Sequence, residues 1–268
     1  MNASSNRQFA VVTGASSGIG YELARQFGKN GFDLLVVSGK EHIKDAERAI
    51  EETGASVQSL QADLATYDGV EKLYKAIQET GRRLDAIAIN AGVGISGDFA
   101  RQTDLEDELN LINLNVVSPV HLAKRVLKDM LAAGGGRILF TSSIAGTMPG
   151  PFEAVYNASK AFLTSFAQAV RNELKDTNVS VTVLMPGPTE TEFFRRAGLE
   201  DTKLGAGEKD DPAEVARQGF EALMAGKDHI VAGSFKNKLQ AMAGHLLPDT
   251  TMAEMHRGES EPGSAAND

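Results

Sequence analysis

Tyr156 and Lys160 are the residues whose types and spacing best suit proton-transfer chemistry. Side chains at this i, i+4 spacing lie one turn apart on the same face of a helix. A free phenol titrates near pH ~10 and transfers protons poorly at neutral pH, whereas a neighbouring ammonium favours the phenolate and lowers its pKa. The pair therefore predicts a tyrosine that acts as a general acid or base. An isolated pair of this kind is more often a half-exposed contact on an ordinary helix, so the prediction depends on a nucleotide site elsewhere in the chain.

A glycine-rich segment near the N-terminus predicts such a site. Residues 9–12 are apolar and predict a buried strand, and the residues after Gly20 have the apolar spacing of a helix. Between these elements stand Gly14, Ser16, Ser17, Gly18, Ile19 and Gly20. A glycine turn between a strand and a helix lets a pyrophosphate approach the bare backbone, where free N–H groups and the helix dipole bind it. The alternative is a tight connection that binds no ligand.

The end of the second predicted strand, residues 33–37, bears on the choice of cofactor. Folds that bind NAD place an Asp or Glu on the ribose 2′-hydroxyl about 20 residues after the first glycine. In this chain Ser38, Gly39 and Lys40 stand there instead. No acid is present to repel a 2′-phosphate, and Lys40 can form an ion pair with that phosphate. The sequence therefore favours NADP over NAD. The alternative is that Lys40 is a solvated residue at the start of a helix and that Ser38 serves the ribose of NAD.

Strands and helices alternate along the chain, and this order predicts an α/β fold with a doubly wound parallel sheet. Further strands are expected at residues 56–60, 84–89, 137–140, 179–184 and 229–232. We expect a single Rossmann-type domain over residues 1–256. Open sheets of this kind bind ligands at the carboxyl ends of their strands. The other candidate residues lie at or just beyond those ends: Asp63, Leu64, Asn90, Ala91, Gly92, Thr141, Ser143, Pro186, Gly187 and Thr189.

Three further parts of the chain each allow more than one interpretation, and a fourth predicts disorder. Asp63 either caps the next helix or faces an adenine. Residues 193–210, polar and glycine-rich after two phenylalanines, form either a flap over the pocket or an ordinary surface excursion. The apolar residues of 235–246 recur at helical spacing beside two lysines; they pack on the body or a second subunit, or contact a membrane surface. Residues 257–268, rich in Gly, Ser, Pro and Asn, predict a disordered tail.

The composition argues against several classes of function. A net charge of −9 disfavours nucleic acid as a partner, because phosphate binding needs a basic face. The absence of cysteine excludes disulfides, thiolate ligands and cysteine nucleophiles, and the five histidines show no metal-ligand pairing, so no metal is expected. Residues 1–8 are polar, and no apolar run reaches about 18 residues, so we expect a cytoplasmic protein with no membrane span.

Together these motifs resemble those of the single-domain short-chain dehydrogenases/reductases, over residues 9–231. The matching residues, in the order and spacing of that family, are Thr13, Gly14, Gly18, Gly20, Asn90, Ala91, Gly92, Asn115, Ser143, Tyr156, Lys160, Pro186 and Gly187. The resemblance implies a Rossmann sheet of about seven strands and hydride exchange between a nicotinamide and a carbonyl or alcohol. The chain departs at Ile89, where the family often has Asn, and at Gly39, where NADP-preferring members often have Arg.

The resemblance also implies catalytic roles. Tyr156 would donate a proton to the carbonyl oxygen in reduction and remove it in oxidation. Lys160 would lower the pKa of Tyr156 and bond the nicotinamide ribose. Ser143 would hydrogen-bond the substrate oxygen, and Asn115 would hold a water that links Lys160 to bulk solvent.

Further implied roles concern binding and assembly. Pro186, Gly187 and Thr189 would border the nicotinamide amide, and Asp63 with Leu64 the adenine. Members of the family usually form homo-oligomers, so a dimer or tetramer is expected, although the chain beyond Val231 is longer than in common members.

The expected activity is that of a carbonyl reductase, which interconverts a ketone or aldehyde and an alcohol with NADP. Two alternatives are a nucleotide-binding regulator or scaffold without turnover, and an epimerase or dehydratase that uses the same Tyr–Lys pair through a transient ketone. The expected pocket walls are mainly apolar and predict a moderately hydrophobic substrate. They include Phe99, Met148, Phe152, Val155, Phe193 and Phe194.

Overall fold

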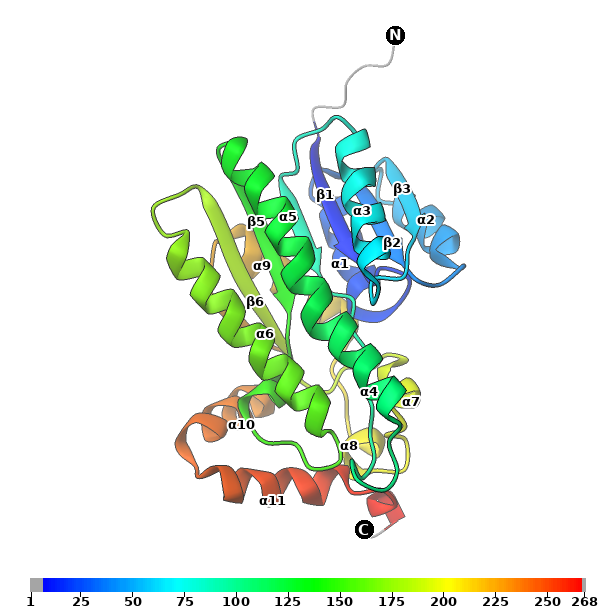
Figure 1. Cartoon of the computed structure of the whole chain (residues 1–268), viewed down its shortest axis with the longest axis vertical. Coiled ribbons are helices and arrows are strands. Elements are labelled where there is room, and N and C mark those ends of the chain that lie inside the picture. The colour runs from blue at the N-terminus through cyan, green and yellow to red at the C-terminus, as the bar shows by residue number, and fades with distance from the viewer. Residues whose placement is uncertain (1–6, 267–268) are drawn as a thin grey trace.

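The computed structural model describes residues 7–266, apart from the His245 side chain, and forms one parallel sheet with helices on both faces (Figure 1). The predicted α/β, doubly wound fold is confirmed. In this part of the chain the sheet has seven strands in the order β3-β2-β1-β4-β5-β6-β7, and all neighbouring strands are parallel. The strands are β1 (Gln8–Thr13), β2 (Phe32–Ser38), β3 (Val57–Gln61), β4 (Ala86–Ile89), β5 (Gly136–Thr141), β6 (Val179–Pro186) and β7 (His229–Ala232).

Strand residues alternate between two apolar layers, because successive side chains point to opposite faces of a sheet. Val11 belongs to the layer formed with α3 (Tyr67–Glu79), α5 (Ser118–Ala132) and α6 (Ala154–Glu173). Its neighbour Val12 belongs to the layer formed with α1 (Gly18–Lys29), α2 (Ile43–Glu51) and α9 (Pro212–Met224). Figure 1 shows α5 and α6 side by side in front of the sheet, with α1 and α9 behind it.

Helix starts follow local capping chemistry. Asp211 accepts a hydrogen bond from the Ala213 N–H (2.9 Å), and Pro212 occupies the first turn of α9. At α3 the cap is Thr66, whose hydroxyl accepts from the Gly69 N–H (3.0 Å), so the interpretation of Asp63 as this cap is wrong.

The helical region that contains Asn115 is not α-helical throughout. α4 (Leu105–Ile112) and α5 are joined by a π-helical turn, Asn113–Val117. Turns of this kind are frequent at functional sites, and apolar spacing does not reveal them.

The chain end corrects the prediction of disorder. Residues 257–260 complete α11 (Asp249–Ser260), and Ser264–Ala266 form a 3₁₀ turn. The composition was misleading because long-range contacts order this segment: the Ser260 hydroxyl donates to the Pro151 carbonyl (2.9 Å), and the Gly263 N–H donates to Asp201 (3.1 Å). Residues 267–268 lie outside the described part of the chain, as do residues 1–6.

Except for α9, the helices after β6 gather at the end of the molecule opposite the start of β1 (Figure 1). α7 (Phe193–Ala197) and α8 (Lys203–Ala206) enclose a small apolar cluster of their own within the predicted flap. α10 (Phe235–Leu246) follows β7 and leads to α11. The apolar stripe of α10 does not pack on the body, since its members are 59–78% exposed: Phe235, Leu239, Met242 and Leu246.

Candidate active site

A cavity of about 1210 Å³ opens at the carboxyl ends of the strands. The chain order reverses here between β1 and β4, which is where sheets of this topology bind ligands. Ser143, Tyr156 and Lys160 line the cavity. All the other residues predicted to bind the cofactor also line it: Gly14, Ser16, Ser17, Gly18, Ile19, Gly20, Ser38, Gly39, Lys40, Asp63, Leu64, Asn90, Ala91, Gly92, Thr141, Pro186, Gly187 and Thr189.

The turn after β1 leaves no room for larger residues. A Cβ on Gly20 would lie 2.3 Å from the Gly14 carbonyl oxygen and 2.4 Å from Asn90 Nδ2. Thr13 Oγ1 accepts the backbone N–H groups of Asn90 (2.9 Å) and Ala91 (3.0 Å), which holds the loop after β4 against this turn. The N-cap of α1, Ser17, makes no side-chain bond to the first N–H groups of the helix. A bare turn and uncapped N–H groups fit the pyrophosphate of a dinucleotide.

Polar and cationic side chains gather at the end of β2. The Ser38 hydroxyl donates to Ser16 Oγ (3.0 Å) and accepts from the Lys40 backbone N–H (3.2 Å), which joins β2 to the glycine turn. Lys40 and Arg196 both line the cavity. Burial and the neighbouring Arg196 guanidinium lower the pKa of Lys40, and Glu192 opposes this effect. Two cations near each other at a cavity wall favour an anion between them. The predicted cofactor contacts did not include Arg196, which belongs to the predicted flap.

Tyr156 and Lys160 lie on the same side of α6 and are both buried. Lys160 Nζ is 5.6 Å from the centroid of the Tyr156 ring and donates to the Thr141 carbonyl oxygen (3.1 Å). Ser143 Oγ, at the end of β5, accepts from the Ala145 N–H (3.1 Å). The end of β5 and the helix α6 therefore bring a hydroxyl, a phenol and an ammonium to one wall of the cavity.

The pKa of Tyr156 is raised, which corrects the expectation that Lys160 lowers it. Burial is the largest cause, the Glu153 carboxylate adds to it, and a hydrogen bond with Ser143 opposes both. Burial also lowers the pKa of Lys160 to about 8. The spacing of Tyr156 and Lys160 indicates an attraction between ammonium and phenolate, but it does not reveal the cost of burying a charge. The phenol is therefore protonated at neutral pH, as a proton donor must be.

Asn115 lies in the π-helical turn, and it does not line the cavity. Its Oδ1 accepts from the Val93 N–H (3.0 Å), and its Nδ2 donates to the Val93 carbonyl (2.9 Å) and to Ser159 Oγ (3.1 Å). The Ser159 hydroxyl in turn donates to the Tyr156 carbonyl (2.7 Å). Asn115 thus ties the loop after β4 to α6. A Cβ on Gly92 would meet Asn115 Oδ1 at 3.1 Å and Lys160 Nζ at 3.4 Å, so both side chains border this glycine.

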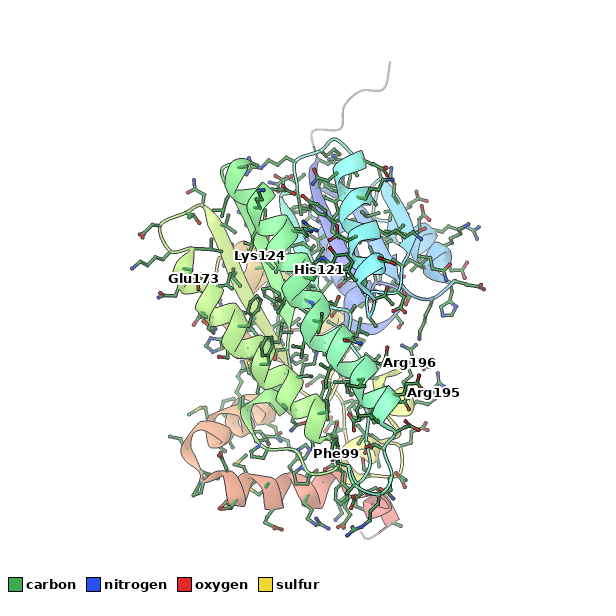
Figure 2. All side chains as sticks on the ribbon, in the orientation of Figure 1. Phe99, His121, Lys124, Glu173, Arg195 and Arg196 are labelled. Atoms are coloured by element: carbon green, nitrogen blue, oxygen red, sulfur yellow. The ribbon has the colours of Figure 1, made fainter. Side chains whose placement is uncertain are left out.

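The apolar walls differ in part from the prediction. Met148, Phe193 and Phe194 line the cavity, whereas Phe99, Phe152 and Val155 do not. Phe99 is 61% exposed on the outer surface (Figure 2). The C-terminal helices supply other wall residues: Leu239, Met252, Met255 and His256. No sequence signal places them here, because they join the site only through the packing of α10 and α11.

A model of the short chain dehydrogenase family matches residues 8–201. The match includes the glycine turn, the strand ends and the Tyr156 helix. The chain belongs to this family. The resemblance inferred from the motifs is therefore confirmed, and the protein is an NAD(P)-dependent oxidoreductase.

Curated relatives of this dehydrogenase differ in their named substrates. Sulfoacetaldehyde reductase 2 of Chromohalobacter salexigens is 33% identical over 189 residues, which cover 68% of this chain and 73% of the relative. NAD-dependent glycerol dehydrogenase of Listeria innocua is 29% identical, over 85% of this chain and 94% of its own. The family is thus shared while the named substrates are not.

Solved structures agree with the fold of this dehydrogenase. A short-chain dehydrogenase from Sphingobium yanoikuyae in complex with NADPH has a TM-score of 0.77 and 27% identity, covering 89% of this chain and 93% of its own. A short chain dehydrogenase/reductase from Burkholderia phymatum in complex with NAD has a TM-score of 0.81, covering 97% and 99%, and at 22% identity it supports the fold alone.

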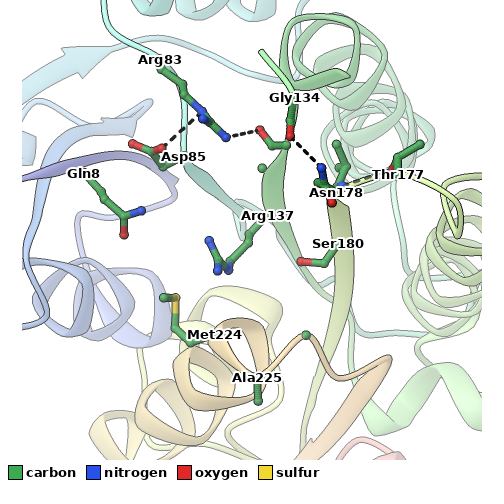
Figure 3. Close-up of a pocket in the computed structure, with 14 residues that line it drawn as sticks. Gln8, Arg83, Asp85, Gly134, Arg137, Thr177, Asn178, Ser180, Met224 and Ala225 are labelled. Carbon is green, nitrogen blue, oxygen red and sulfur yellow. Dashed lines mark hydrogen bonds and ion pairs between the residues drawn. The ribbon is translucent and has the colours of Figure 1, made fainter. Parts of the chain in front are cut away.

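A second hollow, of about 500 Å³, lies at the amino-terminal edge of the sheet and contains none of the predicted site residues. Figure 3 shows its polar lining, in which Arg83 reaches Asp85 (3.5 Å) and the Gly135 carbonyl (3.1 Å), and Asn178 donates to the Gly134 carbonyl (3.3 Å). Within the described residues, no cluster of three or more His, Asp or Glu side chains suits a metal ion. No helix among them has the length and apolar character needed to cross a membrane.

Proposed function

We propose that this dehydrogenase is an NADPH-dependent carbonyl reductase that interconverts a ketone or aldehyde and an alcohol. The main support is that a buried, protonated tyrosine shares one cavity with Ser143, Lys160 and a glycine turn that suits a dinucleotide. The direct test is NADPH oxidation by purified protein that depends on an added carbonyl compound.

The proposed chemistry divides between cofactor and protein. When bound, the nicotinamide supplies the hydride. Tyr156 donates the proton to the carbonyl oxygen, and the Ser143 hydroxyl hydrogen-bonds the same oxygen as its charge develops. Lys160, whose pKa is about 8, is mostly charged at neutral pH and stabilises the phenolate left behind. Asn115 holds the loop after β4 and α6 together around Lys160.

The preference for NADPH rests on the end of β2. Lys40 and Arg196 line this part of the cavity. Among the described residues no carboxylate lies within ion-pair distance of either cation, although Glu192 acts on both from farther away. Ser38 stands where NAD-binding folds place an acid. We propose that the two cations bind the 2′-phosphate that distinguishes NADPH from NADH.

We expect NADPH to bind at least about tenfold more tightly than NADH, a difference of about 1.4 kcal/mol. Lys40→Gln and Arg196→Gln should each weaken NADPH binding by about tenfold and leave NADH binding nearly unchanged, because only NADPH has the 2′-phosphate. Titrations that follow nicotinamide fluorescence measure both. Lys44→Gln, on the exposed start of α2, is the matched control and should bind like wild type. Equal or tighter binding of NADH by wild type would contradict this prediction.

The substrate is proposed to be moderately hydrophobic. Met148, Phe193, Met252 and Met255 give the substrate side of the cavity apolar walls, and methionine adapts to irregular shapes. In a panel of carbonyl compounds, we expect apolar ketones and aldehydes to give kcat/KM values at least about tenfold above those of small sugars. Burial of about two extra methylene groups would stabilise their transition states by this amount. A panel in which small sugars rank first would show this proposal to be wrong.

We also propose a homo-oligomer, either a dimer or a tetramer. α5 and α6 lie side by side on an uncovered face (Figure 1), and large apolar side chains are exposed on and beside them. These are Leu109, Val117, Leu131 and Phe162, which are 43–52% exposed. Contact with a second copy would remove this surface from water.

A further inference from the structure

One face of α11 is buried near the active site, although this helix lies beyond the residues that the family model matches. Met252, His256 and Ser260 recur every four residues and are 1%, 7% and 0% exposed. Two of these three side chains are polar, and a buried polar group needs a hydrogen-bond partner. Both partners belong to residues 151–153, the segment directly before the Tyr156 helix.

The two polar side chains of α11 hold both ends of this segment. His256 Nε2 lies 3.1 Å from Glu153 Oε2, and both side chains are buried. The Ser260 hydroxyl donates to the Pro151 carbonyl (2.9 Å). α11 is therefore attached to the start of α6 by polar contacts, which have stricter geometry than apolar packing.

Phe152, between these two contacts, is held in an unfavourable backbone conformation. Its φ of 64° is the only positive value of a non-glycine residue in the described chain. A bulky residue keeps such a conformation only where its surroundings enforce it. The Gly97 N–H donates to the Phe152 carbonyl (2.8 Å), and the Arg257 guanidinium of α11 lies 5.0 Å from the ring centroid. The segment is thus fixed from two sides.

Glu153 connects this arrangement to Tyr156. Although it is the N-cap residue of α6, its carboxylate makes no capping bond and contacts His256 instead. It lines the cavity together with Tyr156 and His256. Its charge also raises the pKa of Tyr156.

The far end of the tail is attached to the flap. The Gly263 N–H donates to the Asp201 carboxylate (3.1 Å), and Ser264 Oγ accepts from the Lys203 N–H (2.9 Å). The second half of α11 and the residues after it are therefore attached at two places, and Met252 and Met255, which precede these attachments on the helix, line the cavity.

We propose that His256 is a positioning residue of the active site, and that α11 is the wall against which the substrate and the Tyr156 helix are aligned. His256 acts through Glu153 to hold the start of α6, and with it the Tyr156 hydroxyl, at the carbonyl oxygen of the substrate. This role rests on the proposed carbonyl reduction. It extends the site to a part of the chain outside the family match.

The test compares His256→Ala with two other variants of the full-length chain. In His256→Ala we expect kcat for carbonyl reduction to fall by about tenfold and KM for the carbonyl to rise by about fivefold, because misplacement of a catalytic group slows proton transfer. The Kd of NADPH should stay within about twofold, since the dinucleotide contacts lie on other elements. His256→Gln, whose amide can still donate to Glu153, should recover most of kcat/KM.

His121→Ala is the matched control. His121 Nε2 makes the same kind of contact with Glu71 (2.6 Å), but it lies on α5, away from the cavity (Figure 2). This variant should lose some thermal stability and keep the kcat and KM of wild type. If His256→Ala does not fold, Glu153→Ala removes the same contact, with the same direction of change expected in kcat and KM.

Amide hydrogen exchange supplies a readout that needs no substrate. Exchange over residues 151–160 should be faster in His256→Ala than in wild type and unchanged in His121→Ala. Absence of NADPH-dependent turnover in wild type would overturn the proposed function without affecting this measurement. A folded His256→Ala with wild-type kcat, KM and exchange would overturn the positioning role, as would a His256→Gln variant no better than His256→Ala.

Discussion

Replacing Tyr156 with phenylalanine is expected to lower kcat for carbonyl reduction by about 10³-fold or more, while the Kd of NADPH changes by no more than about twofold. The substitution removes only the hydroxyl that donates the proton. The ring, which lies 5.2 Å from that of Phe193, keeps its packing. Steady-state kinetics and nicotinamide fluorescence measure the two quantities on the same preparation.

Tyr74→Phe is the control for this substitution. Tyr74 lies on α3, packs against the apolar layer under that helix and does not line the cavity. Loss of its hydroxyl should leave kcat unchanged. Retention of more than about a tenth of wild-type kcat in Tyr156→Phe would exclude the phenol as the main proton donor, since general acids contribute about 10²-fold or more.

Replacing Lys160 with methionine is expected to reduce kcat by about 10²-fold and to raise the free energy of unfolding at neutral pH. The activity falls because the ammonium no longer stabilises the phenolate that forms when Tyr156 gives up its proton. The stability rises because folding of the wild type buries a charge, and methionine fills a similar volume without one. Active sites commonly reduce stability in this way.

The pH dependence of this stability difference follows from the pKa of Lys160. Burial lowers this pKa from 10.5 to about 8, a difference that corresponds to about 3 kcal/mol. Below pH 8 the lysine is charged in both folded and unfolded states, so the full cost of burial applies. Between about pH 8 and 10.5 the unfolded chain binds more protons than the folded one, and the cost disappears as pH rises.

Denaturant unfolding at several pH values measures this effect. The stability advantage of Lys160→Met over wild type should shrink by about 2 kcal/mol between pH 7 and 9.5. Comparing the two proteins at each pH cancels the contributions of the other titrating groups to the free energy of unfolding. The loss of the hydrogen bond to the Thr141 carbonyl, worth about 1 kcal/mol, reduces the advantage equally at each pH where Lys160 is charged. An advantage that stays constant over this range would show that Lys160 is not buried as a charged group.

Features with local causes could be predicted from the sequence. The glycines of the turn after β1 indicate a close approach of backbone and ligand, because a residue without a Cβ is needed where there is no space for one. Tyr156 and Lys160 lie on one face of α6 because helical geometry is the same in every protein. The alternation of strands and helices determines which strand ends meet, so residues as distant as Ser38 and Pro186 could be assigned to one cavity.

Features that depend on burial could not be predicted in this way. The pKa of Tyr156 moves in the opposite direction from the one that its spacing to Lys160 suggests, because burial of the phenol and the nearby Glu153 carboxylate raise it. Asn115 stands in a π-helical turn, although the apolar spacing around it suits an ordinary helix. Phe99 and Phe152 are as apolar as Phe193, yet only Phe193 lines the cavity.

The sequence by itself determined the family, the fold and the chemical groups that meet at the strand ends, because motif spacing and the order of elements are encoded over short stretches. Only the tertiary structure decided the pKa values of those groups and which residues enclose them. His256 and Glu153 are 103 residues apart, and no local pattern links them. Their contact exists because the long-range packing of α11 orders a tail whose composition predicts disorder, and packing of this kind is a property of the whole folded chain.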